Sequence, residues 1–271
     1  MNRFTSKQKL QSPGFTLLEF LVVFATFMVI IAGVFAQIGK FQQVYTAEGT
    51  KVDASQESRT LLDEITHELH QSGYPNQYLI DPSVLAVTVP VNSKYVAAGL
   101  VKVSNYELWF EGDIDGDGVV DVVHYMLMDS SGSAVTASST CPCTLQRSQV
   151  QKADATAPTS QTSTTWASGL SNILNSGGVG AGGAALTISG TTNGTSNDTL
   201  YSAYKTPKVF VPLDQNGNAI TSLPIDYANN LTTISTVKSI VVTVNTLTLN
   251  SDLQTRAPVP FTNTVTVKLN N

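Results

Sequence analysis

The sequence predicts an α+β protein in which one long amino-terminal helix packs on an antiparallel β-sheet head. An apolar run from Phe20 to Ala36, interrupted only by the polar Thr26, predicts that this helix begins inside a membrane. Apolar residues then recur at spacings of three and four as far as Leu69, which indicates that the helix continues. After Tyr74 the pattern changes to short alternating segments, which favours a head built from strands.

Residues 1–14 form a short polar leader in front of the apolar run. The leader carries three basic residues (Arg3, Lys7 and Lys9) and no acidic one, so its removal lowers the net charge of the chain from −5 to −8. Because basic flanks stay on the cytoplasmic side, we expect the head to lie across the membrane. Residues 15–38 are long enough to span a bilayer once, since about 20 apolar residues suffice. No second candidate span follows in the sequence.

The junction of the leader and the apolar run reads Gly14-Phe15-Thr16-Leu17-Leu18-Glu19. A charge at membrane depth costs about 2.5–3.5 kcal/mol on insertion scales, so a carboxylate there indicates a partner or a role. The basic leader, Gly14 and Glu19 together resemble the start of a type IV prepilin. The resemblance implies that a prepilin peptidase cuts after Gly14 and that the new terminal Phe15 is N-methylated. It also implies that Glu19 attracts the terminal amine of a neighbouring subunit during assembly.

Two observations qualify this resemblance. An ordinary signal anchor that includes one glutamate is the alternative explanation of the same run. The apolar helix also contains no proline, whereas major pilins have one in the middle, so the kink expected of them is not predicted here.

Residues 39–72 are predicted to form the amphipathic half of the same helix. Phe41, Ile65 and Leu69 are among the apolar residues that recur on one face, while acidic and amide side chains occupy the other positions. Gly39 and Gly49 each weaken a helix by roughly 1 kcal/mol relative to alanine, so a local break is expected near them. Gly73, followed by Tyr74 and Pro75, predicts the end of the helix.

Residues 73–271 are predicted to form a β-rich head. The expected strands cover residues 84–89, 106–110, 119–128, 209–211, 239–244 and 264–269. Between about Ser130 and Ser202 the composition shifts to Ser, Thr, Gly and Ala, which predicts a long and partly disordered surface insertion. A short helix at Trp166 to Leu174 is expected within it.

An acidic loop, Asp113-Ile-Asp115-Gly-Asp117-Gly-Val119-Val-Asp121, separates two predicted strands. Its carboxylates resemble most of an EF-hand loop, and calcium prefers six to eight oxygen ligands. The four aspartates, the Val119 carbonyl and waters are the candidate ligands for a structural Ca²⁺. His124 stands where an EF-hand needs a bidentate glutamate, so the loop is more similar to the calcium hairpins of integrin-type propellers. A solvated turn is the alternative, because Asp and Gly are common turn residues.

Cys141 and Cys143 are the only cysteines, separated by Pro142. An exported domain permits a disulfide, although the ring would be very small, so bonded and free thiols both remain open. The acidic charge gives no footprint for nucleic acid. No nucleophile elbow, P-loop or credible catalytic triad is present in the sequence, so we do not expect an enzyme.

The layout of the whole chain resembles one branch of the prepilin family. The helix end at Ser72-Gly73-Tyr74, the acidic hairpin and the closing Leu269-Asn270 are similar to minor pilins of the PilW type. J-type pseudopilins of type II secretion have a comparable plan. The resemblance implies a pilin-like fold and other pilins as partners through the first helix. It implies a place in the bacterial inner membrane, in contact with its lipid, and later in a pilus or pseudopilus. A calcium-dependent adhesive module, with the insertion as its contact surface, is the alternative of another class.

Overall fold

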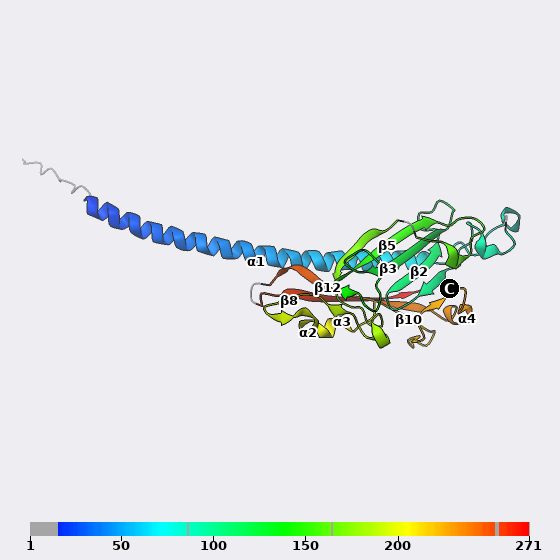
Figure 1. Cartoon of the computed structure of the whole chain (residues 1–271). Helices are drawn as coiled ribbons and strands as arrows, with labels where there is room; N and C mark the ends of the chain where they lie inside the picture. The colour runs from blue at the N-terminus through cyan, green and yellow to red at the C-terminus, as the bar shows by residue number, and fades with distance from the viewer. Residues whose placement is uncertain (1–15, 86, 164, 253–254, 271) are drawn as a thin grey trace, which may run out of the picture. The chain divides into compact units, whose positions relative to one another are not determined.

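The computed structural model describes residues 16–85, 87–163, 165–252 and 255–270. It confirms an α+β protein with one long apolar amino-terminal helix and an antiparallel β-sheet (Figure 1). The chain forms two compact units, the first ending at Thr46 and the second covering Ala47–Asn271. Gly14 and Phe15 lie outside the described residues.

The first element, α1 (Leu17–Gln71), is one helix of 55 residues. It is long and apolar enough to cross a membrane near its amino terminus, by length and composition. The break expected near Gly39 or Gly49 is absent, since both residues are helical. The helix ends before Gly73, whose φ of 84° suits glycine and whose N–H donates to the Glu111 carbonyl at 2.9 Å.

The carboxyl-terminal part of α1 supplies one side of the core of the second unit. Leu61, Leu62, Ile65 and Leu69 are buried in a cluster with side chains from the sheet. Leu61 and Leu62 lie four and three residues before Ile65, and Leu69 lies four residues after it, so the four side chains share one face of the helix. The amphipathic pattern in this part of the sequence therefore corresponds to a buried helix face.

One sheet of nine strands runs in the order β10-β12-β6-β5-β3-β2-β1-β11, with β13 pairing β12 outside this path. Its strands are β1 (Leu100–Val103), β2 (Glu107–Gly112), β3 (Asp121–Met128), β5 (Cys143–Gln151), β6 (Ala167–Ile173), β10 (Phe210–Leu213), β11 (Ile225–Asp226), β12 (Ser239–Ser251) and β13 (Pro258–Lys268). All pairings in this sheet are antiparallel.

The remaining elements are short. Two small ladders join β4 (Thr140–Cys141) to β7 (Thr187–Ile188), in parallel, and β8 (Thr191–Thr192) to β9 (Thr195–Ser196). The short helices are α2 (Asn197–Leu200), α3 (Ser202–Lys205) and α4 (Leu231–Ile234), and 3₁₀ turns lie at 82–84, 90–92, 158–160 and 181–183.

Five of the six expected strands coincide with β2, β3, β10, β12 and β13. The strand expected at residues 84–89 was wrong, because its described residues form the end of a 3₁₀ turn and bends. Val84 and Val89 are exposed there. Pro82 and Pro90, on either side of the expected strand, have no backbone N–H to donate to a neighbouring strand.

The segment from 130 to 202 differs most from expectation. The helix expected at 166–174 is the strand β6, and both β5 and β6 are interior strands of the sheet, so this segment is not a surface insertion. Its small residues serve close packing, since a Cβ on Gly169 would lie 2.9 Å from the Leu145 carbonyl oxygen. The composition of residues 130–202 suggested disorder because pairing between strands that lie far apart in the chain produces no pattern in the local sequence.

Candidate functional site

Glu19, the residue expected to act in assembly, lies in the first turn of α1. Its Oε2 accepts hydrogen bonds from the Thr16 N–H at 2.9 Å and the Thr16 hydroxyl at 3.0 Å. The Glu19 N–H in turn donates to the Thr16 Oγ1 at 3.3 Å. This reciprocal arrangement is a capping box, which satisfies donors that a helix start otherwise leaves free. In the single chain the Glu19 carboxylate therefore has an internal partner.

The acidic loop joins β2 to β3 next to the end of α1. The N–H of Asp113 donates to the Tyr74 carbonyl at 2.9 Å, which holds the start of the loop against the helix terminus. The Asp113 carboxylate accepts from the Gly116 and Gly118 N–H groups at 2.9 and 3.1 Å. Both glycines have positive φ, 76° and 85°, so the turn requires residues without a side chain at these two positions.

The structure brings three of the expected ligands together. One carboxylate oxygen from each of Asp113, Asp115 and Asp117 lies within 4.8 Å of the other two. Asp121 is not in this group. Its side chain is buried and accepts from the Ile114 N–H at 3.2 Å, and burial raises the pKa of its carboxyl group. The loop thus offers three convergent oxygens to a hard cation, with the remaining positions left for waters or carbonyls.

A buried ion pair, which sequence reasoning missed, lies on the face of β2 opposite the core helix. The Lys152 Nζ lies 2.6 Å from the Glu111 Oε2, and both side chains are almost completely excluded from solvent. The same ammonium donates to the carbonyls of Val91 and Val96 at 2.6 and 2.9 Å. Burial raises the pKa of Glu111 and lowers that of Lys152, which the attraction between the two charges opposes.

A second buried cluster surrounds His124 on β3. Its Nε2 lies 2.8 Å from Glu107 Oε1, and its Nδ1 lies 3.1 Å from the Ser163 hydroxyl. The ring stacks on Trp109 and contacts Trp166, with centroids 5.1 and 5.0 Å away. Burial alone would raise the pKa of Glu107, but hydrogen bonds from His124 and Lys102 lower it by more. His124 is mostly enclosed by these neighbours, so the cluster connects Ser163 and Trp166 to the sheet.

A third network joins α1 to the sheet. Glu68, buried in the helix face, accepts from the Tyr125 hydroxyl at 2.6 Å and from the Arg147 guanidinium, whose Nε is 2.9 Å away. Burial is the main reason why the pKa of Tyr125 is raised, and the neighbouring Glu68 raises it further. Because Tyr125 lies on β3 and Arg147 on β5, this network sets the position of the helix on two strands.

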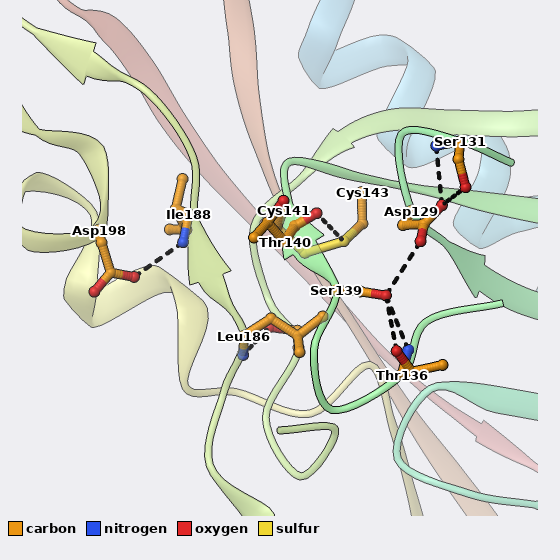
Figure 2. The surroundings of a disulfide bond; sticks show 11 residues. Asp129, Ser131, Thr136, Ser139, Thr140, Cys141, Cys143, Leu186, Ile188 and Asp198 are labelled. Carbon is orange, nitrogen blue, oxygen red and sulfur yellow. Dashed lines mark hydrogen bonds between the residues drawn. A yellow bond between two sulfur atoms is a disulfide. The ribbon is translucent and has the colours of Figure 1, made fainter. Parts of the chain in front are cut away.

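Cys141 and Cys143 form a disulfide that connects β4 to β5 (Figure 2). Both residues are buried in the hydrophobic cluster. The Cys141 carbonyl accepts from the Ser189 N–H at 2.6 Å, and the Ile188 N–H on β7 donates to Asp198 at 2.9 Å. The disulfide therefore lies inside the fold, and the parallel pairing of β4 with β7 connects this part of the chain to β7.

Comparison with known proteins finds no matching family model, no matching curated protein and no matching solved structure.

Proposed function

We propose that this chain is a minor pilin, a structural subunit that assembles or primes a type IV pilus and has no enzymatic activity. The observation that carries the proposal is the apolar surface of α1 beyond a membrane span. About 20 residues suffice to cross a bilayer, and the run from Leu17 to Ala36 provides them. Phe41 and Tyr45 follow with 71% and 86% of their surfaces exposed, and Val52 is also exposed.

An apolar helix face that continues outside the membrane is unfavourable in water and is typical of an interaction site. Packing against the helices of neighbouring pilins would remove this surface from water. The partners implied by the proposal are therefore other pilins through α1, the inner-membrane lipid around residues 15–38, and the prepilin peptidase that cuts after Gly14 and methylates Phe15.

In this proposal Glu19 exchanges partners on assembly. The carboxylate leaves the hydrogen bonds of Thr16 and pairs with the Phe15 amine of an adjacent subunit. In hydrocarbon the attraction between opposite charges is much stronger than in water, which favours one stagger between neighbouring helices. The capping box supports the proposal because it gives the carboxylate a neutral partner before assembly.

The amino terminus of the mature protein tests the proposal most directly. We expect mass spectrometry of the protein from its native membrane to show a chain that begins with N-methylated Phe15. Gly14→Val should leave the leader attached, because the peptidase needs a residue without a side chain there. Recovery of the native chain with Met1 in place and an unmodified Phe15 would refute the assignment.

The role of Glu19 is tested by two substitutions that differ in one property. Glu19→Gln keeps the acceptor that a capping box needs but removes the charge, whereas Glu19→Ala removes both. We expect both variants to be processed normally and both to be depleted from sheared filaments. If Glu19→Gln enters filaments as well as the wild type, the carboxylate serves only as a helix cap.

We also propose that the acidic loop binds a structural Ca²⁺. The convergence of Asp113, Asp115 and Asp117 supports this, because three carboxylates so close together repel one another unless a cation lies between them.

A J-type pseudopilin of type II secretion remains the alternative within the same family. Deletion of the gene distinguishes the two functions, because a minor pilin is needed for pilus assembly and a pseudopilin for type II secretion. If the chain is instead a calcium-dependent adhesive module, deletion of the gene should abolish binding to surfaces and leave the number of filaments unchanged.

A further inference from the structure

A cavity of about 80 Å³ lies inside the second unit, between α1 and the strands β6 and β12. Asp53 and Glu57 line it from the helix, and Thr246 lines it from β12. A single water needs only about 10–15 Å³ of such space, so the cavity is large enough for a small ligand group.

Two carboxylates lie on the helix side of the cavity. Asp53 and Glu57 are four residues apart and exposed, so they share one face of α1. Within the part of the chain that the structure describes, neither side chain forms an ion pair or a hydrogen bond. Lys51 lies two residues earlier but pairs with Glu48 and Asp252. Because like charges at this spacing repel, a cation in the cavity would stabilise the helix surface.

A buried hydroxyl faces the same cavity. Thr246 is only 2% exposed, and its Oγ1 has no hydrogen-bond partner among the described residues. Its register partner is Phe261, two residues before Asn263, whose Nδ2 bonds the Ser58 Oγ on α1. Paired residues, and residues two apart on one strand, point to the same face of a sheet, so the Thr246 side chain is directed toward α1. A buried hydroxyl without a partner is unfavourable, and a donor in the cavity would satisfy it.

Leucine side chains complete the wall and indicate the kind of cation. Leu170 and Leu247 are buried, whereas Leu249 is 80% exposed. A hard metal ion prefers six or more oxygens, and among the described residues no third acidic, histidine or cysteine side chain converges with Asp53 and Glu57. An ammonium on an alkyl stem matches both parts of the wall. Its three N–H groups donate to oxygens, and its methylene groups contact the leucines.

We propose that this cavity binds a primary alkylammonium group. Asp53 and Glu57 supply the counter-charge, the Thr246 hydroxyl accepts one hydrogen bond, and the leucines contact the alkyl stem. Two sources have this chemistry, a free linear amine and the lysine side chain of a neighbouring protein. The inference does not depend on the pilin assignment, because it uses only contacts within the second unit.

Titration calorimetry of the full chain in an uncharged detergent, with butylammonium chloride as the probe, tests the proposal. We expect one saturable site. Asp53→Asn and Glu57→Gln should each weaken binding about tenfold, because each removes a charged acceptor. Asp63→Asn is the matched control, since Asp63 is an exposed carboxylate on the same helix that does not line the cavity. Binding that does not saturate, or equal effects of Glu57→Gln and Asp63→Asn, would overturn the proposal.

The role of the buried hydroxyl has its own test. Thr246→Val removes the hydroxyl and keeps the branched shape of the side chain. We expect butylammonium binding to weaken about threefold. The melting temperature of the ligand-free variant should be no lower than that of the wild type, because the hydroxyl has no internal partner to lose. A lower melting temperature with unchanged binding would contradict the role given to Thr246.

The shape of the probe tests the walls of the cavity. Butylammonium should bind more tightly than methylammonium, because each buried methylene group contributes up to about fourfold. Tetramethylammonium, which has no N–H to donate, should not bind. Equal binding of the three ions would reduce the site to a patch of negative charge and overturn the proposal. Displacement of butylammonium by calcium from the Asp115→Asn variant would show a metal site instead.

Carbodiimide treatment in the native membrane distinguishes the two sources, because the reagent joins a carboxylate to an amine in contact with it. Mass spectrometry then identifies the amide. A bond from Asp53 or Glu57 to a lysine of another polypeptide assigns the site to a protein side chain, and a bond to a small amine assigns it to a free ligand. If exposed carboxylates elsewhere in the chain react while these two form no amide, the proposal is wrong.

Discussion

At the scale of single residues, Lys152 and Glu111 form the most enclosed ionic contact among the described residues. The ammonium has three acceptors, the Glu111 carboxylate and the carbonyls of Val91 and Val96. A buried charge is tolerated only when it is paired and hydrogen-bonded in this way. The pair therefore holds the 90–98 segment and the end of β5 on β2.

Lys152→Met is expected to destabilise the protein by about 3–5 kcal/mol, because it leaves the Glu111 carboxylate buried without a counter-charge. The measurement is urea unfolding followed by circular dichroism. The double variant Glu111→Gln, Lys152→Met should recover most of the loss, since it removes both charges. Lys51→Met is the matched control: Lys51 pairs with Glu48 and Asp252 near the surface, where such pairs contribute about 0–1 kcal/mol. Equal effects of the two single variants would contradict this account.

At the scale of elements, the hairpin between β2 and β3 combines a tight turn with converging carboxylates. Its backbone is already satisfied by its own aspartates, as in the bonds from Gly116 and Gly118 to Asp113. The loop is therefore shaped before any metal binds. A cation would add stability by relieving repulsion between carboxylates and would not be needed to form the turn.

Calcium at millimolar concentration is expected to raise the melting temperature of the full chain in detergent by about 5 °C. Extracellular calcium modules bind with Kd of about 10⁻⁴–10⁻³ M, which gives about 1–2 kcal/mol of stabilisation at several millimolar. Asp115→Asn should abolish the response while leaving the metal-free protein no less stable, because it also lowers the repulsion. Magnesium, which is smaller and needs a more regular site, should give less. An unchanged melting temperature after addition of chelator would leave the loop as a turn only.

At the scale of the whole molecule, the chain divides at Thr46 into a unit that carries the apolar segment, which is long enough to span a membrane, and a unit that carries the core. The buried residues of α1 begin at Ala47 and include Leu61, Leu62, Ile65 and Leu69. The second unit therefore contains every part of α1 that its core requires.

Residues 47–271 are expected to fold without the membrane segment and to unfold in one cooperative transition, measured by calorimetry. Residues 74–271 should not fold, because each lost core Leu or Ile costs about 2–5 kcal/mol and a domain has only about 5–15 kcal/mol in total. Cooperative unfolding of residues 74–271 at a similar temperature would show that α1 is an accessory to the head and not part of its core.

The acidic loop shows how far local patterns extend in this protein. The spacing of its aspartates and glycines was sufficient to place a tight hairpin between two strands. The sequence also suggested Asp121 as a ligand, but this side chain is turned inward to the Ile114 N–H, which depends on how β3 lies in the sheet. The clusters around His124 and Lys152 gave no sequence signal, since their partners lie 17 and 41 residues away.

By itself, the sequence determined the long apolar helix, its end at Gly73 and the α+β class, because these depend on spacing and on residues that are neighbours in the chain. Only the tertiary structure decided that β5 and β6 belong inside the sheet, that Glu68 meets Tyr125 and Arg147, and that Asp53 and Glu57 share a cavity with Thr246. The physical reason is that strand pairing and burial join residues far apart in the chain, and no local pattern of polarity records which distant strand will be the neighbour.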